Sequence, residues 1–253
     1  TCALPIYYGL TDKGIVRKNN QDCFLAEEAR GFLVAVLCDG MGGHVSGELA
    51  SKIASETFMS EVKAGLTSRT KTKPDIPALL KNACQAANRE VCEHAQLSQS
   101  FEGMGTTLVG IILNRNGSAY IANIGDSRCY LLSQLPKRIR QVTTDHSLVE
   151  EYVRAGIITR EEARTHPKKN IITRAVGSDD PEPEADVFKL HLFRGQALLL
   201  CSDGLSNFVT DSDILNSFYI TPRDPEKLCR LLMEQTFRNG AGDNVTMFAV
   251  VKI

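Results

Sequence analysis

Short apolar runs separated by turn residues dominate the pattern of hydrophobic and polar positions along the chain. Turn residues such as Asn114, Asn116 and Gly117 separate neighbouring runs, and runs of this length and spacing predict the strands of antiparallel sheets. The predicted strands cover residues 6–10, 32–38, 107–113, 119–124, 129–132, 138–142, 187–193, 197–201 and 245–253.

Four longer segments have the spacing of amphipathic helices instead. Two lie between the second and third predicted strands, at residues 47–64 and from Asp75 onward, where Asp75 suits a helix cap and Pro77 a first turn. Two more begin at Thr210 and Asp224. Helices inserted in pairs among strands predict an α+β fold, a sandwich of two packed antiparallel sheets flanked by pairs of helices.

Residues 144–180 depart from this pattern. Two short helical pieces, near residues 148–155 and 160–165, are followed by His166 and Pro167, and this predicts a flap inserted over the main body. Residues 1–253 as a whole are interpreted as one domain with the flap as a subdomain, because sandwiches of this length commonly form single domains.

Charge and cysteine content narrow the expected partners and compartment. The formal charge of −1 gives no support for a nucleic-acid or membrane-surface partner, and no apolar stretch approaches the ~20 residues that span a bilayer. The eight cysteines include no CxxC pair, so we expect a reduced, cytoplasmic setting. We also expect a monomer. The chain begins at Thr1, which leaves open an excised piece with an anchor or further domain beyond Ile253.

Aspartates beside glycines at the edges of apolar runs are the most informative feature of the chain. An isolated pair of this kind is usually a turn. Several carboxylates at buried strand ends are harder to explain, because an uncompensated buried charge is costly. Oxygen ligands alone favour hard ions, so the pattern predicts a Mg²⁺ or Mn²⁺ site. The aspartates are Asp39, Asp126, Asp203 and Asp243, with Asp22 in a polar stretch as a fifth.

Metal-assisted chemistry on a phosphate ester is the function this pattern predicts. Two divalent ions ~3.5–4 Å apart would bind a bridging water, and the resulting hydroxide would attack phosphorus in line. The carbonyl of Gly40 is a further candidate ligand, because glycine permits close backbone approach. Arg17, five residues before Asp22, is predicted to hold the phosphate through paired hydrogen bonds.

Seven short motifs occur in the order found in metal-dependent protein phosphatases of type 2C, and the chain resembles a bacterial member of that family over residues 6–253. The resemblance implies the same sandwich fold, with residues 144–180 matching a flap implicated in substrate choice. The motifs are RKNNQD at 17–22, DGMGGH at 39–44, GMGTT at 103–107, GDSR at 125–128, TDH at 144–146, SDG at 202–204 and GDN at 242–244.

The resemblance also implies a ligand for each metal of a two-metal core that uses Mn²⁺ or Mg²⁺. Asp39 would bridge the two ions, with the Gly40 carbonyl on one of them. Asp203 and Asp243 would complete the shell of one ion, and Asp22 would act on the other directly or through water.

A third, weaker metal at Asp126 and a phosphate contact from Arg17 complete the implied site. The implied activity is that of a serine/threonine phosphoprotein phosphatase that also cleaves aryl phosphates. Its expected partners are phosphoserine and phosphothreonine proteins, among them a cognate serine/threonine kinase and its substrates.

Two positions depart from the family's pattern. Met41 stands where eukaryotic members have a histidine proposed as the general acid, although bacterial members share the methionine. The proton donor is therefore open between a metal-bound water, which we prefer, and His44, which is equally well interpreted as a structural residue of the turn. Gln21 replaces a glutamate of many members and removes one acidic partner of a metal-bound water.

Two other functions remain to be separated from this hypothesis. A non-catalytic binding module with the same fold would usually have lost metal ligands, whereas this chain keeps all five aspartates and Arg17. A stress-signalling phosphatase that acts on antagonists of anti-sigma factors shares the fold. The intact flap and Arg17 favour the general type.

Overall fold

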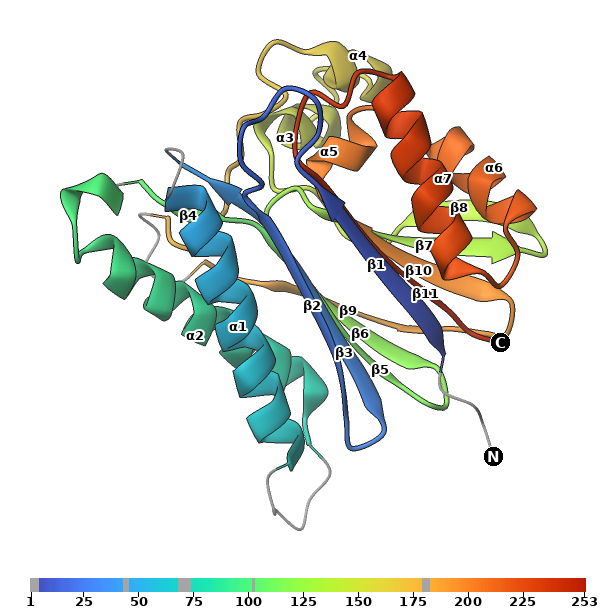
Figure 1. The fold of residues 1–253 in the computed structure, drawn as a ribbon, viewed down its shortest axis with the longest axis horizontal. Coiled ribbons are helices and arrows are strands. Elements are labelled where there is room, and N and C mark those ends of the chain that lie inside the picture. Colours follow the sequence, from blue (N-terminus) through green and yellow to red (C-terminus); the bar gives the residue numbers. More distant parts are fainter. Residues whose placement is uncertain (1–4, 43–45, 68–73, 102, 179–182) are drawn as a thin grey trace.

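Two β-sheets pack face to face and carry helices on their outer sides (Figure 1). The computed structural model of the chain describes residues 5–42, 46–67, 74–101, 103–178 and 183–253. Every ladder between strands in these ranges is antiparallel. The predicted α+β sandwich is confirmed.

The two sheets divide the strands in the orders β1-β11-β10-β7-β8 and β2-β3-β5-β6-β9, with β4 paired to β3. The first sheet contains β1 (Ile6–Asp12), β7 (Arg128–Gln134), β8 (Lys137–Gln141), β10 (Gln196–Cys201) and β11 (Val245–Val251). The second contains β2 (Asp22–Ala29), β3 (Phe32–Met41), β4 (Gly105–Thr106), β5 (Leu108–Asn114), β6 (Ser118–Ile124) and β9 (Asp186–His191).

Helices cover the outer face of each sheet (Figure 1). α1 (Ser46–Thr67) and α2 (Ile76–Ala95) pack on the second sheet, and the 3-10 helix η1 (Gln99–Phe101) follows them. On the first sheet lie α5 (Asp203–Ser206), α6 (Asp211–Ile220) and α7 (Pro225–Arg238). Within the described residues, none of the helices combines the length and apolar content that crossing a membrane requires.

Side-chain caps fix the starts of three of these helices where the sequence predicts them. The side chains of Asp75, Thr210 and Asp224 each accept a hydrogen bond from the backbone N–H three residues further on. Such caps satisfy donors that the first helical turn leaves free, and they typically contribute about 1 kcal/mol each.

Strand β3 shows why the central apolar runs are continuous. Its side chains alternate between two buried surfaces: Val34, Val36 and Cys38 face α1 and α2, while Leu33 and Leu37 face the other sheet. Because both faces of the strand are covered, no polar position is required until Asp39. The apolar run of the strand therefore gives way to the carboxylate of Asp39 near the edge of the sandwich.

Strand β2 is the main element that the apolar pattern does not predict. It lies at the edge of the second sheet, and its side chains are half-buried or exposed after Asp22. Glu27 and Glu28 occupy its outer half. Charged residues on an edge strand discourage pairing with other chains, and they also remove the apolar signal.

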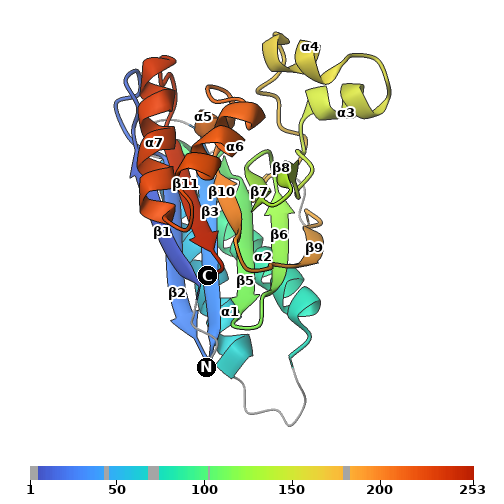
Figure 2. The same ribbon diagram turned by 90° about the vertical axis from the view of Figure 1, so that its right-hand side faces the viewer.

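The flap, residues 144–178, carries α3 (Leu148–Arg154) and α4 (Arg160–Thr165), which stand off one end of the sandwich (Figure 2). Its two ends are joined at His146, whose carbonyl accepts the Thr173 N–H at 2.9 Å. The His146 Nδ1 accepts the Gly125 N–H at 3.0 Å. Burial, with the nearby Arg174, lowers the pKa of His146, so the neutral ring keeps this acceptor. The flap is thereby anchored beside Gly125.

Candidate metal centre

Acidic residues from both sheets meet at one end of the sandwich. Asp22 opens β2 and is the register partner of Asp39 on β3, and Asp126 lies two residues after β6. From the first sheet, Asp203 follows β10 at the start of α5, and Asp243 lies two residues before β11. A cleft of about 420 Å³ is lined by Arg17, Asp39, Gly40, Asp126, Asp203 and Asp243, among others.

Two glycines allow the strand ends to approach closely enough to form this cleft. A Cβ on Gly40 would lie 2.0 Å from the Gly47 carbonyl oxygen, and one on Gly204 would lie 1.8 Å from that of Asn244. No side chain fits at such distances from backbone. Glycine beside the aspartate is therefore a steric requirement at both positions.

Asp22 has an oxygen that the protein does not satisfy. Its Oδ2 accepts the Ser202 hydroxyl at 2.8 Å, whereas its Oδ1 is buried and has no hydrogen-bond partner among the described residues. Burial raises the pKa of Asp22 to about 7, against the opposing effect of hydrogen bonds with Thr246 and Ser202. A buried carboxylate oxygen without a partner is costly, so it fits a position that contributes to a cation site.

Asp39 lies at the centre of the cluster. Burial raises its pKa well above the ordinary value, and the charges of Asp22, Asp203 and Asp126 add to the rise. Burial likewise raises the pKa of Asp126 to about 8 and that of Asp203 to about 6. These carboxyls cannot all be ionised together at neutral pH without added positive charge. Their oxygen chemistry fits hard divalent ions.

Protein donors hold two of the candidate ligands in the structure. Asn207 Nδ2 donates to Asp203 Oδ2 at 3.0 Å, and Arg17 Nη2 donates to Asp243 Oδ2 at 2.8 Å. In keeping with this, no group of three or more His, Cys, Asp and Glu side chains in the described part of the chain is already arranged to hold an ion. The oxygen ligands fit hard divalent ions, while Oδ2 of Asp203 and Oδ2 of Asp243 each already accept a hydrogen bond from the protein.

The loop that carries Arg17 is held to the cleft by Asn244. The Asn244 Oδ1 accepts the Gln21 N–H at 2.9 Å, and its Nδ2 donates to the carbonyls of Lys13 and Asn19. Arg17 itself is half-exposed on the cleft wall, and its hydrogen bond with Asp243 raises its pKa. The sequence pattern gave Asn244 no role, although it is the last residue of a motif.

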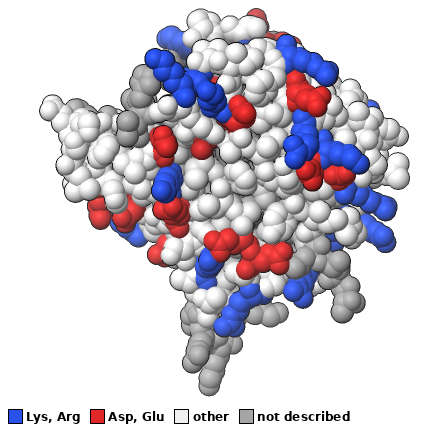
Figure 3. Space-filling view, in the orientation of Figure 1, with Lys and Arg blue, Asp and Glu red and all other residues white. Residues whose placement is uncertain are grey.

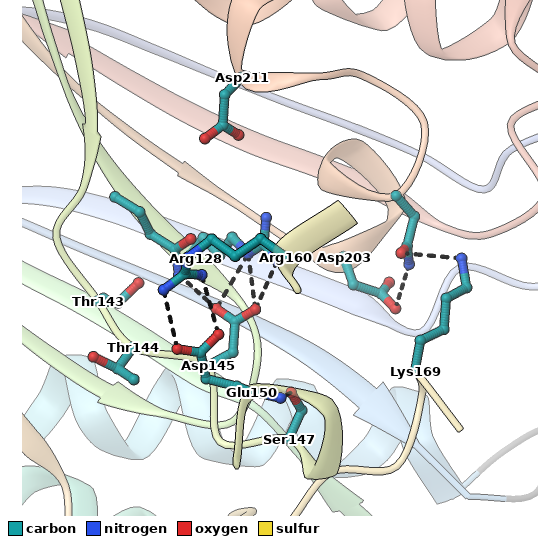
Figure 4. A network of polar contacts seen from close by, with 12 residues as sticks. Arg128, Thr143, Thr144, Asp145, Ser147, Glu150, Arg160, Lys169, Asp203 and Asp211 are labelled. Carbon is teal, nitrogen blue, oxygen red and sulfur yellow. Dashed lines mark hydrogen bonds and ion pairs between the residues drawn. The ribbon is translucent and has the colours of Figure 1, made fainter. Parts of the chain in front are cut away.

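A chain of contacts links the flap to Asp203. The Lys169 Nζ donates to Asn207 Oδ1 at 3.3 Å, and Asn207 in turn holds Asp203 (Figure 4). Asn207 stands four residues after Asp203, which is the spacing of neighbours on a helix and the signal that sequence reasoning overlooked. Lys169 is beyond such reasoning, because its position depends on how the flap folds back.

Ion pairs order the flap on the same side of the cleft (Figure 4). Asp145 accepts from Arg128 Nε and Nη2, the latter at 2.7 Å, and so ties the start of the flap to β7. Glu150 pairs with Arg160 inside the flap. These contacts, together with the His146 anchor, give the flap a defined position next to Asp126.

The two positions that depart from the family's pattern also lie at the cleft. Met41 and Gln21 both line it, and neither side chain is acidic or basic. His44, the candidate proton donor, lies outside the described residues.

Comparison with known proteins places this chain in one class, the protein phosphatases of type 2C. The family of protein phosphatase 2C matches residues 15–238. The serine/threonine phosphatase stp of Listeria monocytogenes is 35% identical over 95% of this chain and 93% of its own.

Solved structures agree with this assignment. Serine/threonine phosphatase Stp1 from Staphylococcus aureus superposes with a TM-score of 0.89 at 34% identity, over 98% of this chain and 95% of that one. The catalytic domain of the phosphatase PstP in complex with two manganese ions gives 0.82 at 34%, over 98% and 99%. The chain belongs to the protein phosphatase 2C family.

Replacing Asp39 tests the metal centre through stability. Saturating Mn²⁺ at about 100 times its Kd is expected to raise the melting temperature of the wild-type protein by about 5–10 °C. Asp39→Asn replaces a carboxyl whose raised pKa makes it destabilising at neutral pH, so the metal-free variant should melt higher than the metal-free wild type while its response to Mn²⁺ is lost. Thermal melts with and without Mn²⁺ measure both effects.

A matched change of charge on the exposed Glu61 of α1, Glu61→Gln, should leave the Mn²⁺ response intact. The pH dependence of the metal-free protein supplies a second check. The raised pKa values stabilise the fold below the unfolded value near 4, and this stability is lost as pH rises through about 6–8. An Mn²⁺ response that survives in Asp39→Asn would contradict the assignment of Asp39.

Asn207 is expected to support metal binding without touching the metal. Asn207→Ala should raise the Mn²⁺ concentration at half-maximal thermal stabilisation about 10-fold or more, as is usual for residues that orient ligands. The matched control is Asn216→Ala, because Asn216 also accepts a lysine hydrogen bond but lies outside the cleft. Equal Mn²⁺ midpoints for the two variants would rule out the orienting role.

Proposed function

We propose that this serine/threonine phosphatase hydrolyses phosphoserine and phosphothreonine esters of proteins at the acidic cleft, with Mn²⁺ or Mg²⁺ bound there. The observation that carries the proposal is the convergence of carboxyls from both sheets on Asp39, with raised pKa values that call for cations. The relationship to a phosphatase whose structure contains two manganese ions supports it.

Five groups would hold the two core metals. They are Asp22, Asp39, the Gly40 carbonyl, Asp203 and Asp243. Bound divalent ions would lower the pKa of water and offset negative charge on the phosphate oxygens. A third metal beside Asp126 is proposed on the carboxyl's place at the cleft and its raised pKa.

Arg17 would bind the substrate phosphate. Its guanidinium lies on the cleft wall and now donates to Asp243. Since Asp243 is also a candidate metal ligand, metal binding would leave the guanidinium free to turn its paired donors to phosphate oxygens. The Asn244 contacts keep the Arg17 loop in place during this exchange.

Several finer features belong to the same proposal. The leaving oxygen would take its proton from water at the site or from His44. The flap would contribute to substrate choice, and a cognate serine/threonine kinase would be among the partners. We further propose that residues 1–253 form one catalytic domain that acts as a monomer in the cytoplasm.

Metal dependence is the first test. Metal-stripped protein should release no phosphate from a phosphothreonine peptide, and adding Mn²⁺ should restore turnover, because the cluster needs cations to bind an anionic substrate. Phosphate release is measured before and after the addition, in the presence of an okadaic-acid-type inhibitor that should have no effect. Folded protein that is inactive at every Mn²⁺ and Mg²⁺ level would favour a binding module instead.

Replacing Arg17 tests the phosphate contact. Arg17→Lys keeps the charge but loses the paired donors, and a lost hydrogen bond to a charged group costs about 1.5–3 kcal/mol. We therefore expect kcat/KM to fall about 10- to 100-fold for peptide and aryl phosphate alike. Lys18→Arg, at the exposed neighbouring position, is the control. An unchanged kcat/KM for Arg17→Lys would refute the contact.

A further inference from the structure

A second open groove adjoins the acidic cleft. It has a volume of about 830 Å³ and lies between the C-terminal half of α2, η1 and the segments 103–105 and 177–178. Met41 and Ser178 line both the groove and the cleft. The two hollows therefore adjoin each other, with Met41 and Ser178 between the groove and the acidic cleft.

The walls of the groove are tied together by a buried contact. The Oδ1 of Asn88 on α2 accepts the Gly177 N–H at 2.7 Å. Asn88 is 1% exposed, so this bond is shielded from water. The groove is thus formed in the protein without a ligand, and binding there needs no rearrangement of these two walls.

Apolar side chains make up much of the groove surface. Met41, Cys92 and Ala95 contribute it, and methionine adapts its shape to different ligands. Residues 95–101 contain no charged side chain, and the lobe on the left of Figure 3 is mostly white, with acidic atoms along its lower margin. The groove thus suits an uncharged ligand.

Exposed polar side chains lie along the rim. Gln96, Ser98 and Gln99 are exposed and offer donors and acceptors of the kind that pair with a peptide backbone. Arg89 and Glu93 are the charged residues among the described lining, and their signs cancel. The described lining thus has no excess of positive charge that would attract a free phosphate or a nucleic acid.

We propose that the groove binds the stretch of the phosphoprotein next to the phosphorylated residue, as an extended segment with uncharged side chains. The inference rests on the proposed function, since a phosphoprotein whose phosphate occupies the cleft must continue beyond it at about 3.3 Å per residue. Because the groove adjoins the cleft at Met41 and Ser178, it offers a path for one side of that chain. An aryl phosphate has no such continuation.

Filling the groove separates the two substrates. Glu93→Trp and Gln99→Trp place a large ring at exposed lining positions. Neither side chain forms a hydrogen bond or ion pair with another described residue. We expect KM for a phosphothreonine peptide of about ten residues to rise about tenfold, with kcat little changed and kcat/KM for p-nitrophenyl phosphate unaltered, because only flanking contacts are lost. Steady-state kinetics with Mn²⁺-loaded protein measure these constants.

The matched control is Asn82→Trp. Asn82 is also exposed on α2, but it lies 11 residues before Glu93, about 16 Å along the helix. This variant should turn over both substrates like the wild type. Shortening the peptide on one side of the phosphothreonine should raise KM for the wild type but not for Glu93→Trp, whereas shortening the other side should affect both proteins equally.

Three results would overturn the inference: an unchanged peptide KM in both groove variants, a parallel loss with peptide and aryl phosphate, or the same effect from Asn82→Trp. A wild-type protein that cleaves neither substrate would instead contradict the proposed function. The two failures are therefore distinguishable in one set of assays.

Discussion

Repulsion between neighbouring carboxylates governs the end of the sandwich where the two sheets meet. Two like charges 4 Å apart repel by about 4 kcal/mol at the dielectric typical near a protein surface. The whole fold is stable by only about 5–15 kcal/mol. The cluster around Asp39 therefore needs protons or cations. In agreement with this, burial first and neighbouring carboxylates second raise the pKa values of Asp22, Asp126 and Asp203.

The architecture makes this crowding unavoidable. Alternating burial along β3 delivers Asp39 to the edge, the β2–β3 register sets Asp22 beside it, and Ser202 from the other sheet hydrogen-bonds Asp22. Close approach of the Gly204 and Asn244 backbones then brings the neighbouring Asp203 and Asp243 together. The carboxylates cannot separate without breaking the packing of the sandwich, so charge neutralisation is the remaining way to relieve the strain.

The accuracy of sequence-based prediction varied with the kind of interaction. Runs buried on both faces, such as β3, and capped helix starts, such as Asp75, were predicted because their signals are local. Strand β2 was missed because an exposed edge strand needs no apolar pattern. Aspartates beside glycine indicated the site because only glycine permits the close backbone approach at Gly40 and Gly204. The contact of Lys169 with Asn207 joins residues 38 positions apart and depends on the folded flap, which no local spacing encodes.

Phosphate recognition in the cleft cannot by itself distinguish one phosphoprotein from another, because the metals and Arg17 would contact groups common to all of them. Selectivity must then come from surfaces beside the cleft, and the structure offers two that act differently. None of the candidate metal ligands is in the described lining of the groove along α2, so we expect occupancy there to change mainly affinity. The flap reaches Asp203 through Lys169 and Asn207, so a partner that moves the flap alters the ligand set and hence turnover. Separate sites for affinity and for rate would let one cleft act on different phosphoproteins with different outcomes.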